Sequence, residues 1–289
     1  MIAEERVSEH DDPRLHWAFL SQAVRDAAYD NNGAVANSPA LIEERNRLSA
    51  AYRAKPGAVL DLNYAPGERT RWDLYPAADP NAPCLVFIHG GYWQRNSREV
   101  FAMVAEGLAA HGWSVALPSH TLAPDASLTQ IVGEMRAAMD WLAAHGPEHG
   151  ISGPIIVSGW SAGGHLTAML LDHPAVKAGL AISGVYELAP IRDTKLNEAL
   201  KLTEDEIRTL SPLRLPVVDK PLAIVYGSAE LPALVQDARL FHAKRAAAHA
   251  PGPLVPIPGE DHFSILAHLR RPDGALVKLA RSLLESAAP

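Results

Sequence analysis

The chain has 289 residues, of which 48% are hydrophobic and 20% charged, and it carries a net charge of −7. This length and composition are typical of one large α/β domain and require no second folded domain. The negative charge and the lack of a Lys/Arg-rich run in the sequence argue against nucleic acid or an anionic membrane as the partner, so we expect a small molecule.

The amino-terminal sequence and the single cysteine indicate the compartment. Residues 1–6 are polar and acidic, so no secretory signal is evident, and no apolar run in the sequence approaches the length of a membrane span. Cys84 cannot form an internal disulfide and lies in a strand-like run, where we expect a small core residue rather than a thiol catalyst. We therefore predict a cytoplasmic protein, and the sequence leaves homo-oligomerisation open.

The first 57 residues predict a helical arm. They are polar and helix-prone, with one apolar face available near residues 15–20 and another near 42–48, and with turn formers between them at 29–39. Such a segment buries little apolar surface by itself. We expect residues 1–57 to form a lid or brace packed on the main domain, and a solvated arm is the alternative.

From residue 58 to 289 the pattern becomes that of an α/β domain. An edge hairpin is predicted over 59–64 and 71–76, joined by a Pro-Gly turn. Buried strands are predicted at 84–88, 113–118, 154–160, 179–183, 221–227 and 254–257, and helices near 97–111, 127–144, 163–171 and 274–286. This alternation predicts a mostly parallel, doubly wound sheet with helices on both faces. The polar excursion at 188–219 is expected to contribute to a lid or substrate wall.

The sequence Gly-Trp-Ser-Ala-Gly at residues 159–163 follows an apolar, β-prone run and precedes a helical pattern. It predicts a strand, a sharp turn and a helix, with Ser161 at the apex in a strained conformation that the small neighbours permit. The positive end of the helix would face the place where negative charge forms on a substrate. We predict that Ser161 is a nucleophile; the alternative is a glycine-rich turn with an incidental serine.

A serine nucleophile needs a general base and an acid that orients the base, in the chain order serine, acid, histidine. His262 lies in a short loop after the last predicted strand, whereas the other histidines beyond Ser161 fall in or beside helical patterns. A surface histidine beside Asp261 is the alternative. For the acid we favour Glu230, which follows a strand by one short loop, over Asp237, which we place inside the next helix on a solvated face.

Stabilising an oxyanion requires at least two N–H donors aimed near the serine. We predict these donors to be the backbone N–H of Ala162, after the nucleophile, and those of Gly90, Gly91 and Tyr92, after a buried strand. His89 is interpreted as a structural anchor of this loop rather than as a second base.

Three aromatic residues, Tyr92, Trp93 and Trp160, are candidates for lining a substrate pocket, although core packing is an equally good interpretation of Trp93. His145 and His149 are four residues apart, the spacing of a metal pair on a helix, but the Gly-Pro between them breaks helical geometry and no partner cluster is evident in the sequence. We predict no metal and no cofactor.

The motifs together resemble those of the arylformamidase (kynurenine formamidase) group of α/β-hydrolases. Residues 89–93 are similar to its His-Gly-Gly-x-Trp motif, residues 159–165 to its nucleophile elbow, and 261–263 to the segment of its catalytic histidine. The resemblance spans most of the chain, including residues 29–31 and 37–38. It implies the α/β-hydrolase fold and metal-free hydrolysis of N-formylkynurenine, or of small aryl and alkyl esters in the esterase relatives, by a Ser-Asp-His triad.

The chain departs from that group at two positions. Where the formamidases have Asp followed by Ser-Pro-Glu-Phe, this chain has Glu230 followed by Leu-Pro-Ala-Leu, so the acid is a longer carboxylate. Trp160 stands where a histidine is common. We predict a serine hydrolase that cleaves a small ester or amide through an acyl-enzyme on Ser161, with His262 as base and then acid and Glu230 holding its tautomer. The alternatives are a carboxylesterase with little formamidase activity and a non-catalytic hydrolase-fold protein that binds a small ligand.

Overall fold

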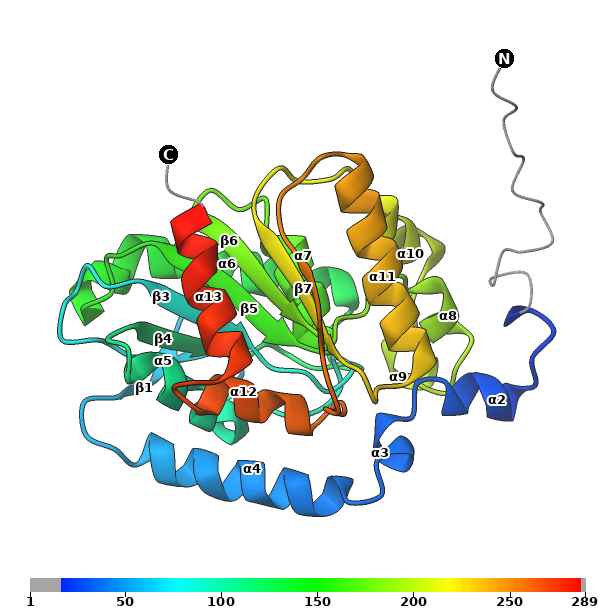
Figure 1. Cartoon of the computed structure of the whole chain (residues 1–289), viewed down its shortest axis with the longest axis horizontal. Coiled ribbons are helices and arrows are strands. Elements are labelled where there is room, and N and C mark those ends of the chain that lie inside the picture. The colour runs from blue at the N-terminus through cyan, green and yellow to red at the C-terminus, as the bar shows by residue number, and fades with distance from the viewer. Residues whose placement is uncertain (1–16, 287–289) are drawn as a thin grey trace.

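An eight-stranded sheet forms the centre of the molecule in the computed structural model, which describes residues 17–286 (Figure 1). Its strands are β1 (Val59–Asn63), β2 (Arg71–Tyr75), β3 (Cys84–Ile88), β4 (Ser114–Pro118), β5 (Ile155–Trp160), β6 (Val176–Ile182), β7 (Leu222–Gly227) and β8 (Leu254–Ile257). The order is β1-β2-β4-β3-β5-β6-β7-β8, with β2 antiparallel to both β1 and β4 and the remaining neighbours parallel. The predicted edge hairpin and mostly parallel, doubly wound sheet are confirmed.

Helices cover both faces of the sheet. In chain order they are α2 (Gln22–Ala27), α3 (Asn31–Ala34), α4 (Ser38–Arg53), η2 (Arg98–Val104), α5 (Ala105–Ala109), α6 (Leu128–His145), η3 (Gly146–His149), α7 (Ala162–Leu170), α8 (Ala189–Arg192), α9 (Asn197–Leu200), α10 (Glu204–Leu210), η4 (Pro212–Arg214), α11 (Pro232–Ala247), η5 (Ser264–Leu266), α12 (Ala267–Arg270) and α13 (Ala275–Ser286). Helix α6 begins with the predicted capping box, in which Ser127 Oγ accepts from Gln130 N and the Gln130 side chain accepts from Ser127 N.

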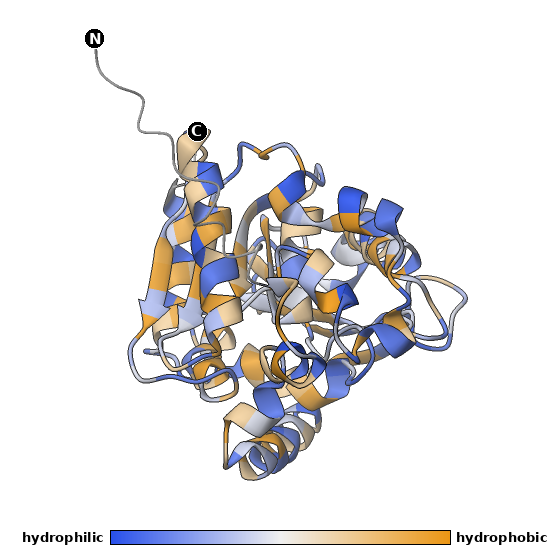
Figure 2. Cartoon of the chain, turned by 90° about the vertical axis from the view of Figure 1, so that its right-hand side faces the viewer, coloured by the Kyte–Doolittle hydropathy of each residue, from blue (hydrophilic) through white to orange (hydrophobic). Residues whose placement is uncertain are grey.

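The two faces of the sheet hold separate hydrophobic clusters because successive side chains of a strand point to opposite faces. In β3, Val86 and Ile88 pack with α6, α7 and α11, whereas Leu85 and Phe87 pack with η2, α12 and α13. Hydrophilic residues are spread over the surrounding helices (Figure 2). Within residues 17–286, no helix combines the length and the apolar character needed to cross a bilayer.

Two elements differ from their predicted bounds by more than one residue. β6 begins at Val176, three residues before the predicted start. The prediction began too late because Lys177, which faces solvent, interrupts the apolar run that marked the strand. The predicted helix at 97–111 is a 3-10 segment, η2, that continues into the short helix α5. Neither difference moves a candidate site residue.

The amino-terminal helices lie beside the sheet rather than within it. Helix α4 runs along the lower side of the molecule in Figure 1 and contacts η2. The loop before α2 and the helix itself contact the segment between β6 and β7: Trp17 Nε1 donates to Asp193 Oδ2 (3.1 Å), and Lys195 N donates to Asp26 Oδ1 (2.8 Å). Two segments far apart in the sequence are thereby joined.

The division of the chain into an arm over 1–57, a catalytic domain over 58–289 and an excursion over 188–219 stays a prediction. Residues 1–16 of the arm, including part of the apolar patch near 15–20, lie outside the described residues. The excursion contains the short helices α8, α9 and α10 and the turn η4.

Candidate active site

Ser161 occupies the turn between β5 and α7, which is the predicted strand, turn and helix. Its φ of 59° and ψ of −118° lie in a region of backbone conformation that residues other than glycine rarely adopt. Its N–H donates to Ile182 O (2.8 Å), and its carbonyl accepts from Gly164 N (2.8 Å), which holds the turn in place. A Cβ on Gly163 would lie 2.0 Å from Ile88 O, so only glycine allows this close approach.

His262 and Glu230 form a buried pair at the same edge of the sheet. His262 Nδ1 lies 2.9 Å from Glu230 Oε2, and the Glu230 side chain is fully buried in the loop between β7 and α11. The other oxygen, Oε1, accepts from Ser183 Oγ (2.6 Å) and from Gly227 N (2.7 Å). Trp160 Nε1 donates to His262 O (2.8 Å) and fixes the loop that follows β8. In the tautomer that carries its proton on Nδ1, His262 would donate to this carboxylate and keep the lone pair of Nε2 free.

The loop after β3 passes directly beside Ser161. A Cβ on Gly90 would lie 2.6 Å from Trp160 O and 2.9 Å from Ser161 Cβ, so the backbone could not pass here with a side chain. The preceding His89 is buried, and its Nδ1 contacts Gly90 O (3.0 Å). Burial holds the pKa of His89 well below its usual range. A neutral, enclosed imidazole supports the interpretation of His89 as an anchor.

The predicted oxyanion donors lie where this loop and α7 begin. Gly91 and Tyr92 have φ values of 123° and 49°, which turn the backbone sharply. Their N–H groups donate to no acceptor in the part of the chain that the structure describes. Ala162 is the first residue of α7, where N–H groups have no intrahelical partner. The arrangement leaves several backbone donors available near Ser161.

Three comparisons point to one group of proteins. A family model described as BD-FAE matches residues 73–177. Kynurenine formamidase of Danio rerio is 26% identical over 248 residues, which cover 80% of this chain and 84% of that protein. Esterase LipC of Mycobacterium tuberculosis is 26% identical over 254 residues, which cover 76% of this chain and 60% of that protein. A solved structure from a Silicibacter species has a TM-score of 0.78 at 28% identity and covers 88% of this chain and 97% of that chain. The chain is a hydrolase with the α/β-hydrolase fold, and it is similar to the arylformamidases and esterases.

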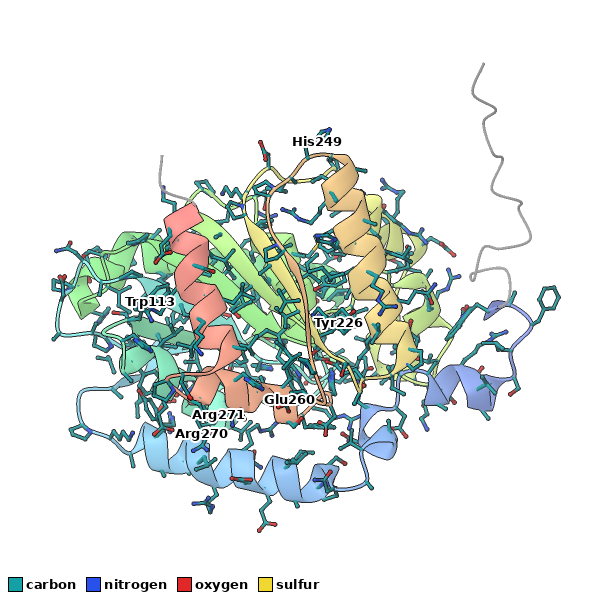
Figure 3. The ribbon with its side chains drawn as sticks, viewed as in Figure 1. Trp113, Tyr226, His249, Glu260, Arg270 and Arg271 are labelled. Atoms are coloured by element: carbon teal, nitrogen blue, oxygen red, sulfur yellow. The ribbon has the colours of Figure 1, made fainter. Side chains whose placement is uncertain are left out.

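The hydrolase has a cavity of about 380 Å³ that Ser161 and His262 both line. Tyr92 and Trp160, two of the three predicted pocket aromatics, also line it. The Trp160 ring lies 4.7 Å from the His262 ring, centroid to centroid. In the view of Figure 3, Glu260, two residues before His262, lies in the loop after β8 at the lower end of the sheet. The cavity therefore opens at the carboxyl ends of the strands, where ligands of such sheets bind.

Trp93, the third predicted pocket residue, does not line this cavity. It is 1% exposed and packs edge to face against His165, with the ring centroids 5.0 Å apart. The alternative interpretation, core packing, is the correct one for Trp93. Its φ of 56° turns its side chain into the core while Tyr92 remains at the cavity.

Part of the cavity wall comes from the amino-terminal segment. Tyr92 Oη donates to Tyr29 O (2.8 Å) and accepts from Asn31 Nδ2 (3.1 Å), so the turn before α3 is bound to the loop after β3. Thr194 and Leu196, from the segment between α8 and α9, contribute to the wall as well. The amino-terminal turn and this segment thus shape the cavity of the hydrolase together.

The prediction that Asp237 lies on a solvated face is wrong. Asp237 is buried in α11 between the apolar residues Leu234 and Phe241, and its Oδ2 accepts from Tyr186 N (2.6 Å) and Glu187 N (3.2 Å). The backbone N–H groups of a neighbouring loop supply the partners that make burial tolerable. Burial raises the pKa of Asp237 to about 7. It anchors the loop after β6, and it is Glu230 that contacts His262.

Ser183 was not singled out from the sequence, although it hydrogen-bonds the carboxylate of Glu230. It directly follows β6 with a φ of 52°. A usable signal was present: Ser183 ends a predicted strand, and the carboxyl ends of parallel strands meet at one edge of a sheet.

His145 and His149 both pack against Trp141, with ring centroids 5.3 and 5.6 Å away, and His145 Nδ1 lies 3.2 Å from Glu148 Oε1. Among residues 17–286, no group of three or more His, Cys, Asp or Glu side chains is arranged to hold a metal ion.

Proposed function

We propose that this serine hydrolase cleaves a small ester or amide by way of an acyl-enzyme on Ser161. The observation that carries the proposal is the 2.9 Å contact between His262 Nδ1 and Glu230 Oε2, at a cavity that a serine in a strained elbow also lines. In this proposal the base His262, the acid Glu230 that orients it and the nucleophile Ser161 act together on a small molecule bound in the cavity.

In the acylation step, Ser161 Oγ attacks the substrate carbonyl and passes its proton to His262 Nε2. The oxyanion receives N–H groups of Ala162 and of the loop at Gly90, Gly91 and Tyr92. The tetrahedral intermediate collapses, and His262 gives the proton to the departing alcohol or amine. Water then attacks the acyl-enzyme by the same route, releasing the carboxylic acid and restoring the serine.

Glu230 is proposed to hold the Nδ1–H tautomer of His262 and to stabilise the imidazolium that forms. Its carboxylate meets three donors, the imidazole, Ser183 Oγ and Gly227 N, which compensates a charge that is fully buried. These contacts fix the carboxylate at hydrogen-bond distance from Nδ1 although glutamate is one methylene longer than aspartate.

The substrate class we propose is a small aryl or alkyl ester, or an N-formyl amide of an aromatic amine. The kynurenine formamidase of Danio rerio supports the second kind and the esterase of Mycobacterium tuberculosis the first. A cavity of about 380 Å³ suits molecules of this size. We also propose a reducing, cytoplasmic location, which the buried free thiol of Cys84 supports.

Comparing kcat/KM for N-formylkynurenine with that for short p-nitrophenyl esters separates the formamidase from a carboxylesterase with little formamidase activity. The test of the chemistry itself is the Ser161→Ala variant, whose alanine fits the small-residue elbow. We expect kcat to fall about 10⁶-fold, as when other triad nucleophiles are removed. Retention of more than roughly a tenth of the turnover would refute the proposal, and absence of turnover in the wild type would favour a ligand-binding protein.

A further inference from the structure

Arg45 lines the same cavity as Ser161 and has an unusual environment for a buried cation. It is one of three buried arginines in the described residues. Arg98 pairs with carboxylates, and Arg245 donates to three backbone carbonyls. Arg45 has one acceptor, Asn46 Oδ1, at 3.2 Å from Nε and 2.8 Å from Nη2. Its remaining N–H donors have no partner among residues 17–286.

The position of the guanidinium is fixed by aromatic packing. Its central carbon lies 4.3 Å from the centre of the Phe101 ring. Phe101 in turn packs on Trp160, and Trp160 packs on His262, with ring centroids 5.7 and 4.7 Å apart. Cation–π contact offsets only part of the free-energy cost of burying a charge. Burial lowers the pKa of Arg45 to about 10, so the guanidinium still carries its charge near neutral pH.

The other charged residues of the cavity leave the cation uncompensated. Two carboxylates line it, but Asp26 Oδ1 accepts from Lys195 N (2.8 Å), and Asp30 Oδ1 accepts from Gly33 N (3.0 Å). Lys195 and Arg95, both exposed, add two positive charges to the wall. No carboxylate of the described residues lies within ion-pair distance of Arg45, so the cavity can accept an anionic group there.

We propose that Arg45 binds the carboxylate of an anionic ester or amide substrate in the cavity that Ser161 and His262 line. A planar guanidinium with adjacent free N–H groups matches a carboxylate with two parallel hydrogen bonds. The inference rests on the proposed function and narrows its substrate class to molecules that carry a negative charge apart from the reacting carbonyl. Arg45 is then a specificity-determining residue that takes no part in the bond breaking.

The experiment uses two pairs of esters in which a carboxylate is either free or masked as its methyl ester: mono-p-nitrophenyl glutarate with its methyl ester, and 3-acetoxybenzoate with its methyl ester. The first pair places the carboxylate on the acyl side and the second on the leaving group. Wild type is compared with Arg45→Met, which keeps the aliphatic stem over Phe101, and with Arg47→Met as control. Arg47 is exposed on another face of α4, so both variants lose the same charge.

We expect wild type to prefer the charged member of at least one pair, and Arg45→Met to lose about 10- to 100-fold in kcat/KM for that member alone, the factor of a charge-assisted hydrogen bond. Arg47→Met should keep the preference. Equal losses for both members, or no loss in Arg45→Met, would mean that Arg45 only braces α4 and would overturn the inference. So would a wild type that prefers neither charged ester.

A binding measurement keeps this test separate from the proposed function. Calorimetry with Ser161→Ala, and with Ser161→Ala combined with Arg45→Met, needs no turnover. We expect the charged ester to bind the single variant about 10- to 100-fold more tightly than the double variant, and the methyl ester to bind both equally. Equal affinity of the charged ester for both would refute the anion site. Absence of turnover with selective binding would leave the anion site standing and refute the hydrolase chemistry.

Discussion

The Glu230→Gln variant follows directly from the hydrogen bonds around the carboxylate. Oε1 accepts from two donors, Gly227 N and Ser183 Oγ, and Oε2 faces His262 Nδ1. A glutamine keeps its oxygen toward the backbone N–H, since a buried N–H without an acceptor costs roughly 1–3 kcal/mol. Its NH2 group then faces His262 Nδ1, which must accept. The imidazole is thereby held with its proton on Nε2, the tautomer that cannot take the proton of Ser161.

This inverted tautomer, together with the lost stabilisation of the imidazolium, should lower kcat roughly 10³- to 10⁴-fold, as in other triads that lose the acid's charge. That factor corresponds to about 4–5.5 kcal/mol of transition-state stabilisation. Glu230→Asp keeps the charge but shortens the side chain by one methylene, so its kcat should lie between those of wild type and Glu230→Gln.

The assay measures kcat for each variant on the best ester substrate, with folding checked by circular dichroism. Asp237→Asn is the matched control, because its amide oxygen can still accept from the two backbone N–H groups and it does not contact His262. We expect its kcat to stay within about threefold of wild type, as for a residue outside the reacting group. Near-wild-type kcat in Glu230→Gln, together with a large loss of kcat in Asp237→Asn, would refute the reasoning and reassign the acid to Asp237.

Three further predictions concern residues around the site and the sheet. Ser183→Ala removes one donor from the Glu230 carboxylate, so kcat should fall about 3- to 30-fold with KM unchanged, whereas a rise in KM at unchanged kcat would contradict this. The pKa of Asp237 is raised from 3.8 to about 7 in the folded protein, so between these pH values the folded state binds a proton that the unfolded state does not. The free energy of unfolding of wild type, relative to that of Asp237→Asn, should therefore decrease as the pH rises from 4 to 7. A difference between the two proteins in urea denaturation that does not change with pH would contradict this. Asp73→Asn leaves buried Arg98 without one of its carboxylates and should lower the free energy of unfolding by about 3 kcal/mol, and a loss below about 1 kcal/mol would show that the pair is not structural.

The sequence could predict the fold and the elbow because both depend on local patterns. Apolar runs of strand length separated by helical periodicity specify a parallel sheet. Gly159 and Gly163 mark a turn in which strand and helix backbones nearly touch. The position of Glu230, one short loop after a strand, predicted the carboxylate that contacts His262, since parallel strands bring their carboxyl ends to one edge.

What the sequence could not predict depends on contacts between distant segments. Asp237 has the spacing of a polar helical residue, and only the loop after β6 supplies the N–H groups that bury it. Trp93 and Tyr92 are neighbours, and a turn of the backbone sends one into the core and leaves the other at the cavity. Ser183 contacts Glu230, and Arg45 lines the cavity. Both environments are built from segments far apart in the sequence, so no single stretch of sequence predicts them.

The central claim is that Ser161 is the nucleophile, and covalent labelling tests it most directly. Wild type and Ser161→Ala are each incubated with a fluorophosphonate and examined by intact-mass and peptide mass spectrometry. Our account predicts one adduct per chain in the wild type, on the peptide that contains Ser161, and none in Ser161→Ala. An unlabelled wild type, or equal labelling of the two proteins, would contradict it.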